Sequence, residues 1–242
     1  MLHSLKRWIG GSRTGPDPRA LQAWARQRGF NVKKVRSGEG LVIEGRSFDL
    51  PWRMEWGAPQ RAYLLDRELR LRMELGLPPS LQMLVTSRAL AEELEQAAYA
   101  LFTQDMQTQI DSGMPEEMRW LAMFPKIQLA AMKPLKARFS AIASAAPPLA
   151  RWLEGELAAR LEEAGGSWLA QDEPLVLMTL RGRLYLRMEA VQPDAALLDR
   201  VLALFEAAAR AAQAAADAAP GHGGWPAGGN TAWQSQSGYS EE

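Results

Sequence analysis

Two segments alternate Leu or Met with charged side chains, or in one position with Tyr, so strictly that each constrains the fold to a strand with one buried and one solvated face. Residues 68–75 read Glu-Leu-Arg-Leu-Arg-Met-Glu-Leu, and residues 183–189 read Arg-Leu-Tyr-Leu-Arg-Met-Glu. Successive side chains of a strand point to opposite faces of its sheet, so the Leu and Met side chains of each segment share one face. Antiparallel sheets carry such strands, with the apolar face on the core and the charged face paired across strands.

Other patterns add further strands and helices to this sheet. Residues 30–36 and 41–44 form a predicted hairpin around a Ser-Gly-Glu-Gly turn, and Trp52, Met54 and Trp56 share one face of a predicted strand over 51–56. The remaining predicted strands cover 81–86 and 175–180. The predicted helices cover 17–28, 88–109, 115–123, 148–164 and a last segment from 194 onwards, while residues 124–146 suit either state. We therefore expect an α+β fold in which an antiparallel sheet packs against long helices.

One folded domain accounts for most of the chain. Residues 17–212 are long enough to bury a core without disulfides or metals. A short basic arm or linker (1–16) precedes this domain, and an Ala-, Gly- and Ser-rich segment (213–242) follows it, which we predict to be a disordered tail. The sequence has no signal-peptide pattern and no run of 18 apolar residues, so we expect a cytoplasmic protein.

The two alternating segments also share a sequence pattern. Leu-x-Leu-Arg-Met-Glu occurs at 69–74 and again at 184–189, and each copy is followed by proline and then by a long apolar helix. One interpretation is a duplication, with two similar ββα-type halves at about 30–110 and 135–212 that share a groove. The other is convergence, because alternating strands in a chain rich in Leu, Arg and Glu repeat short patterns by chance. The sequence leaves both interpretations open.

The side chains that most enzymes use are missing from the predicted domain. The chain has no Cys, and its two His residues, His3 and His222, lie outside residues 17–212. These facts exclude disulfides, thiolate nucleophiles, serine–histidine triads and two-histidine metal sites. The Gly-x4-Gly-Lys-Ser/Thr phosphate loop is also missing. The sequence therefore predicts no catalytic residue, no metal ligand and no cofactor, and it favours a non-catalytic protein.

Arginines on the charged side of the predicted strands form the candidate ligand-binding site. They are Arg53, Arg70, Arg72 and Arg187. We expect these strand faces to come together in the folded sheet, where several guanidinium groups would suit an anionic ligand or partner. The alternative is a neutral surface of cross-strand ion pairs. Four glutamates that alternate with the arginines support that alternative: Glu55, Glu68, Glu74 and Glu189.

These observations predict a binding or regulatory protein that acts through a partner or a small anionic ligand. Residues 1–60 hold 11 basic and 5 acidic side chains, whereas residues 151–242 hold 7 and 13. This asymmetry suits an anionic partner at the basic end or head-to-tail self-association, and the alternative is that the two ends complement each other within one fold. We expect another protein or self-association as the partner. The chain as a whole carries no net charge, so we expect no binding of DNA or RNA.

Two other functional classes stay open. One is a carboxylate-based enzyme, with or without Mg²⁺, in which Glu116 and Asp111 converge on a pocket. The other is a peripheral membrane protein, because Leu2, Leu5 and Trp8 share one face of the basic arm and allow a weak membrane contact.

Two stretches carry a resemblance to known sequences. Residues 148–153 read Pro-Leu-Ala-Arg-Trp-Leu, and together with the predicted hairpin over 175–189 and the Leu- and Ala-rich helix over 197–209 they resemble uncharacterised bacterial domains. Residues 51–57 read Pro-Trp-Arg-Met-Glu-Trp-Gly, and with Glu-Leu-Arg-Leu-Arg at 68–72 they resemble an uncharacterised proteobacterial protein family of unknown function. The shared motifs are structural, so the resemblance implies no activity.

Overall fold

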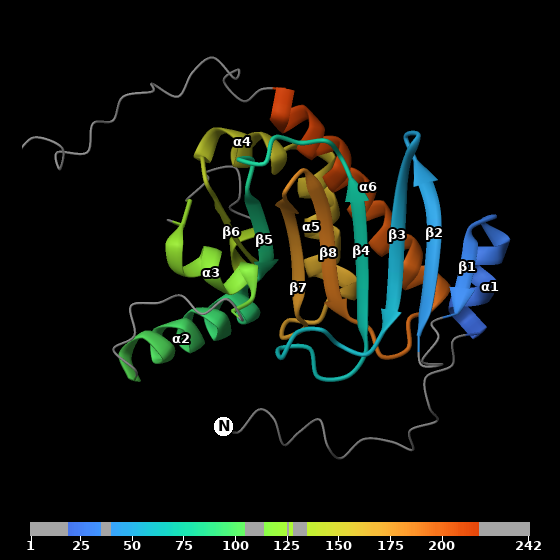
Figure 1. The fold of residues 1–242 in the computed structure, drawn as a ribbon, viewed down its shortest axis with the longest axis horizontal. Helices are drawn as coiled ribbons and strands as arrows, with labels where there is room; N and C mark the ends of the chain where they lie inside the picture. The colour runs from blue at the N-terminus through green and yellow to red at the C-terminus, as the bar shows by residue number, and fades with distance from the viewer. Residues whose placement is uncertain (1–18, 35–39, 105–113, 125, 128–134, 218–242) are drawn as a thin grey trace, which may run out of the picture.

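The computed structural model describes residues 19–34, 40–104, 114–124, 126–127 and 135–217, which form one eight-stranded sheet with helices on both faces (Figure 1). The strand order is β1-β2-β3-β4-β8-β7-β5-β6, and each neighbouring pair is antiparallel. The strands are β1 (Asn31–Lys34), β2 (Leu41–Ser47), β3 (Leu50–Gly57), β4 (Glu68–Glu74), β5 (Met83–Ser87), β6 (Phe139–Ala143), β7 (Leu175–Leu180) and β8 (Arg183–Glu189). The prediction of an α+β fold with an antiparallel sheet is confirmed.

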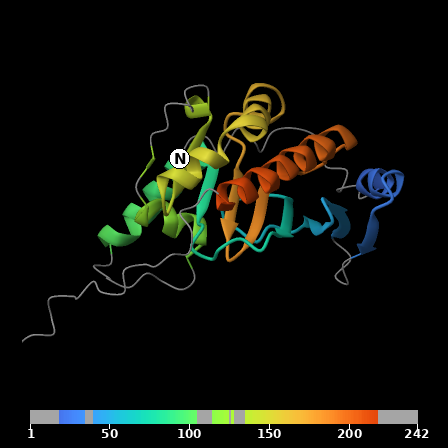
Figure 2. The ribbon, with the colours of Figure 1, turned by 90° about the horizontal axis from the view of Figure 1, so that it is seen from above.

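The helices divide between the two faces of the sheet. One face packs against α1 (Arg19–Gln27), α4 (Ala146–Trp152), α5 (Gly155–Glu163) and α6 (Ala195–Asp217). The view from above in Figure 2 shows α5 and α6 on the same side of the strands. The other face packs against α2 (Arg88–Gln104) and α3 (Glu116–Met123), which lie over β5, β6 and β7. A 3₁₀ turn (Leu135–Ala137) and a π turn (Ala164–Trp168) complete the described helical segments.

The larger core lies between the sheet and α1, α4, α5 and α6. The side chains that the alternation predicted to point inward are all buried: Trp52, Met54, Trp56, Leu69, Leu71, Met73, Leu184, Leu186 and Met188. Buried indole N–H groups find acceptors within this core. Trp56 Nε1 donates to the Ala190 carbonyl at 2.7 Å, and Trp152 Nε1 donates to the Ala208 carbonyl at 3.0 Å. Such pairing avoids the cost of a buried donor without an acceptor.

The predicted helix over 148–164 is two helices in the structure. α4 ends at Trp152, and α5 begins at Gly155, whose φ of +60° lies in the left-handed region. A glycine adopts that conformation without a steric penalty, so the chain turns there and does not continue the helix.

Tertiary burial explains two other segments, one that the sequence left unassigned and one that extends past its predicted boundary. Residues 139–143, which suited either state, form the edge strand β6. Ala141 faces the larger core and Ile142 faces the core under α2 and α3, so this strand is buried on both faces and shows no polar alternation. α6 reaches Asp217, with Ala215 fully buried, so the folded region continues past the predicted boundary at 212.

Some predictions fall on residues that the structure does not describe. These are the basic arm with Leu2, Leu5 and Trp8, most of the turn between β1 and β2, and residues 218–242 of the predicted tail. Among the residues that are described, no helix has the length and apolar character needed to cross a membrane.

Gly45 offers a test of the packing around β2 and β3. It lies directly opposite Trp52, and a Cβ atom at Gly45 would lie 2.2 Å from Trp52 Cζ2. The indole cannot easily move away, because its Nε1 donates to Ser47 Oγ at 3.0 Å and its ring centroid lies 4.8 Å from that of Phe30. We expect Gly45→Ala to lower the free energy of unfolding by about 1–3 kcal/mol, measured by urea denaturation.

Gly166→Ala is the matched control for this substitution. No heavy atom lies within 4 Å of a Cβ built at Gly166, and its φ is not positive. The control should stay within about 0.5 kcal/mol of the wild type. Equal stability of the two variants would show that Trp52 does not fill the space above Gly45.

Candidate functional site

The outer faces of β2, β3, β4 and β8 carry charged side chains beside the part of the sheet that α2 and α3 cover. This side faces the viewer in Figure 1, with α6 behind the strands. The predicted arginines Arg53, Arg70, Arg72 and Arg187 all lie here, and we call this surface the arginine face. The structure thus brings together all four residues of the predicted site.

The strand register makes the four arginines immediate neighbours. Arg53 lies directly opposite Arg72 on the β3–β4 ladder, and Arg70 lies directly opposite Arg187 on the β4–β8 ladder. They line one cavity of about 290 Å³ together with Glu55, Gln60, Leu71, Tyr185 and Leu186. Like charges directly opposite each other destabilise a sheet, so these two pairs need compensation.

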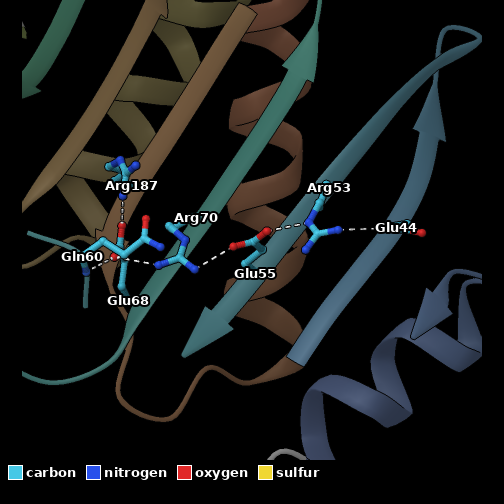
Figure 3. A network of polar contacts seen from close by, with 7 residues as sticks. All are labelled: Glu44, Arg53, Glu55, Gln60, Glu68, Arg70 and Arg187. Carbon is cyan, nitrogen blue, oxygen red and sulfur yellow. Dashed lines mark hydrogen bonds and ion pairs between the residues drawn. The ribbon is translucent and has the colours of Figure 1, made fainter. Parts of the chain in front are cut away.

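Glu55 compensates two of the arginines. Its carboxylate accepts hydrogen bonds from Arg53 Nε at 2.5 Å and from Arg70 Nη2 at 2.6 Å (Figure 3). Arg53 also contacts Glu44 at 3.4 Å, and Glu44 in turn contacts Lys33 at 2.7 Å. An ion-pair chain therefore crosses β1, β2, β3 and β4.

The local field keeps these carboxyl groups ionised. Burial would raise the pKa of Glu55, but the hydrogen bonds from Arg70 and Arg53 outweigh that effect and lower the pKa below its ordinary value. The hydrogen bond from Lys33 likewise lowers the pKa of Glu44. Both groups therefore act as fixed negative charges near neutral pH.

Glu68 compensates the other end of the cluster from a fully buried position. Its side chain has no solvent exposure, and its carboxylate binds Arg70 Nη1 at 3.2 Å, Arg187 Nη1, and the backbone N–H of Gln60 at 2.7 Å (Figure 3). A buried charge is stable only when it is paired and hydrogen-bonded, and Glu68 meets both conditions. Glu68 therefore positions two of the four arginines.

Arg72 is the exception on this face. Its side chain is exposed, and within the described chain it makes no ion pair or hydrogen bond. Its same-face neighbours on β4 are Arg70 and Glu74, and the latter carboxylate is engaged by Arg183 at 2.5 Å. The predicted alternative of a neutral, fully paired surface therefore holds for Arg53, Arg70 and Arg187 but not for Arg72.

A local two-fold axis in the β4–β8 ladder explains this exception. The two copies of Leu-x-Leu-Arg-Met-Glu pair with each other, and Leu71 lies opposite its own equivalent, Leu186. Arg72 is therefore equivalent to Arg187, and the position equivalent to Glu68 is Arg183. Because position 183 carries a cation, Arg72 lacks the carboxylate that holds Arg187.

The two-fold relation is limited to these strands. Val176 and Met178 of β7 occupy the positions that correspond to Arg53 and Glu55 of β3, and they are buried under α2 and α3. The helices α2 and α6, which follow the two copies of the motif, pack on opposite faces of the sheet. Whether the motif reflects duplication of the halves stays a prediction.

The segment between β3 and β4 forms one wall of the cavity. Gln60 lines it, and the next residues anchor the segment to α3. The buried carboxylate of Glu117 accepts hydrogen bonds from Arg61 Nε at 2.7 Å and from the Tyr63 hydroxyl at 2.5 Å. Burial and the adjacent Glu117 raise the pKa of Tyr63 well above its ordinary value, so it remains a neutral donor.

The carboxylates proposed for an enzyme are engaged in ion pairs where the structure describes them. Glu116 pairs with Arg119 and lies 3.7 Å from Arg181. Asp111 lies outside the described residues. In the described part of the chain, no group of three or more His, Asp or Glu side chains is arranged to hold a metal ion.

Sequence reasoning missed three contributors to the site: Gln60, Glu68 as a buried anchor, and Tyr185. Gln60 lies in an irregular segment, which no periodic pattern marks. Glu68 reads as one more solvated charge of an alternating strand, yet it is fully buried. Its position at the first residue of β4, beneath the segment that contains Gln60, becomes evident only in three dimensions.

Comparison of the chain with protein-family models, with curated proteins and with solved structures finds no match to any of them. The resemblance to an uncharacterised proteobacterial family therefore stays a prediction. The chemistry of the arginine face has to be inferred from its own geometry.

Glu68→Gln tests whether this carboxylate anchors the arginine face. The substitution keeps the shape of the side chain but leaves the two guanidinium groups, which are only 18 % and 13 % exposed, without their shared anion. We expect the free energy of unfolding to fall by about 2 kcal/mol in urea denaturation. Glu74→Gln on the same strand is the control, because Glu74 is 61 % exposed and should change stability little. Equal effects would contradict the anchoring role.

Proposed function

We propose that this protein is a non-catalytic binding or regulatory protein that takes an anionic group, carried by a small ligand or a partner, on the arginine face. The observation that supports the proposal is the convergence of four arginines on one cavity, where Arg72 pairs with no carboxylate of the described residues. A guanidinium group donates several hydrogen bonds in a planar fork that matches carboxylate and phosphate oxygens. A bound anion would complete the charge balance of the face.

The energetics of position 72 favour a binding role over a structural one. Arg72 lies opposite Arg53 and on the same face as Arg70, so a carboxylate at this position would have better electrostatic contacts. A side chain that is unfavourable for stability and exposed beside a cavity is typical of functional surfaces. The carboxylates that line or adjoin the cavity already bind guanidinium groups, which favours their use in positioning arginines over acid–base catalysis.

The sequence-based expectations of a cytoplasmic location and of a protein partner or self-association are part of this proposal. The arginine face is compatible with an acidic surface of a partner as well as with a free anion. Both kinds of partner require the same guanidinium groups, so one set of variants tests both.

Arg72→Glu is the most direct variant for this test. Charge reversal at Arg187 would place a carboxylate against the buried Glu68 and would destabilise the fold, whereas Arg72 has no partner to lose within the described chain. We expect Arg72→Glu to be at least as stable as the wild type, because it relieves the repulsion with Arg53. A loss of binding by this variant would therefore not result from unfolding.

Thermal unfolding midpoints in sulfate, phosphate and citrate, each compared with sodium chloride at equal ionic strength, measure the binding. We expect at least one of these anions to raise the midpoint of the wild type saturably, and Arg72→Glu to abolish the increase. Arg200→Glu is the control, because Arg200 is also exposed and lies on α6, on the opposite face of the sheet. An equal response of Arg72→Glu and the wild type, or no response to any anion, would contradict the proposed function.

A further inference from the structure

The hydrogen-bond donors that remain free on the arginine face are unevenly distributed. Arg70 donates hydrogen bonds from Nη1 to Glu68 and from Nη2 to Glu55. Arg53 donates from Nε to Glu55 and from Nη1 to Glu44. Arg187 donates from Nη1 alone, to Glu68, and the side chain of Arg72 donates no hydrogen bond to any described residue. Arg72 and Arg187 therefore keep more free N–H groups than Arg53 and Arg70 do.

These two arginines lie diagonally across the β4–β8 ladder. Arg72 lies opposite Tyr185, which is two residues from Arg187 on β8. Diagonal positions of this kind are about 7–8 Å apart, which a pair of long side chains can span from both sides. A single compact group between them would contact both guanidinium groups.

The net charge of the cavity indicates how much negative charge that bound group should carry. Four arginines line the cavity, and three carboxylates bind them: Glu55, Glu68 and Glu44, which Lys33 also binds. With Lys33 counted, five cations face three carboxylates in this network, which leaves a surplus of two positive charges. A dianion would neutralise this surplus, whereas a monoanion would leave one guanidinium group uncompensated.

The surroundings of the cavity favour a compact anion over a chain of anionic groups. On one side Lys33 and Glu44 neutralise each other, and on another side Arg183 and Glu74 do the same. Beyond β8 the sheet surface is apolar and lies under α2 and α3. A polyanion such as a nucleic acid is bound along a continuous run of cations, which this face does not provide in its described part.

We propose, on the basis of the proposed function of the arginine face, that its ligand carries a phosphoryl dianion, as in a phosphate monoester, which sits between Arg72 and Arg187. Three terminal oxygens on one phosphorus concentrate the two charges at one point and accept forked hydrogen bonds from both guanidinium groups. A dicarboxylate spreads the same charge over separate groups and fits this geometry less well. Glu68 holds Arg187 in place for the ligand, and Arg72 completes the site.

Isothermal titration of the full chain with methyl phosphate, inorganic phosphate, sulfate, succinate and acetate tests this inference. The ionic strength is held constant with sodium chloride. We expect methyl phosphate to bind at least about tenfold more tightly than succinate or acetate, because one compact dianion neutralises the cavity. Inorganic phosphate would bind as well as methyl phosphate if the natural ligand is the free ion, and more weakly if the ester group contributes. Arg72→Gln should weaken binding of methyl phosphate about tenfold or more, and Arg200→Gln should leave it unchanged.

The pH dependence identifies the charge state that binds. A phosphate monoester has a second pKa of about 6, so its affinity should rise about tenfold between pH 5.0 and pH 7.5 if the dianion is the bound form. Sulfate keeps both of its negative charges over this pH range, so a change in its affinity reports a change in protonation of the groups that face the cavity. These groups are Arg53, Glu55, Glu68, Arg70, Arg72, Tyr185 and Arg187.

Three results are distinguishable. Preference for methyl phosphate and sulfate, with a loss in Arg72→Gln, supports the phosphoryl dianion. Two results overturn the inference but leave an anion-binding face. One is binding of succinate or acetate as tight as that of methyl phosphate, and the other is an affinity for methyl phosphate that depends on pH in the same way as the affinity for sulfate. Binding of none of these anions, in a protein whose urea unfolding curve is cooperative, overturns both the inference and the proposed function.

Discussion

The pairing of β4 with β8 is the contact on which both the sheet and its charged face depend. It joins the meander β1-β2-β3-β4 to the block β8-β7-β5-β6, and Leu71 lies opposite Leu186 at its centre. The inner side chains of both strands are buried, so a shift of one residue would turn all of them toward water. The register is therefore fixed by apolar burial, and the same register places Arg70 opposite Arg187 on the outer face.

The magnitudes show why the protein tolerates this crowding of cations. Burial of one Leu or Met side chain stabilises a fold by about 1.5–3 kcal/mol, whereas one unfavourable cross-strand pair costs about 0.2–1 kcal/mol. Glu55 and Glu68 then offset most of the repulsion by binding three of the arginines. Arg72 has no described partner for its charge. The two-fold axis relates Glu68 to position 183, and that position carries an arginine instead of a carboxylate. The charge of Arg72 is thus left without a described counter-ion because of the residue at one position of the ladder, Arg183.

The face on which each arginine lies was predictable, because a period of two assigns every residue of a strand to one side of its sheet. The same periodicity predicted the buried Trp52, Met54 and Trp56. The order of the strands was not predictable. β5 follows β4 in the sequence but pairs with β6 and β7 and not with β4, and no local sequence pattern encodes that crossover. Without strand order, neither the cavity beside Gln60 nor the burial of Glu68 could be derived. The broken helix at Gly155 was missed for a similar reason, since a glycine marks a break only when packing on both sides requires one.

The central claim is that an anion binds between Arg72 and Arg187, where apolar burial on the far side of the sheet has placed free guanidinium donors. The most direct measurement is a titration of the arginine Nε–Hε resonances of the ¹⁵N-labelled protein with methyl phosphate. We predict that the signals of Arg72 and Arg187 move along one common saturation curve while those of Arg26 and Arg200 stay in place. Signals that do not move, or a uniform drift of all arginines with ionic strength, would contradict the account.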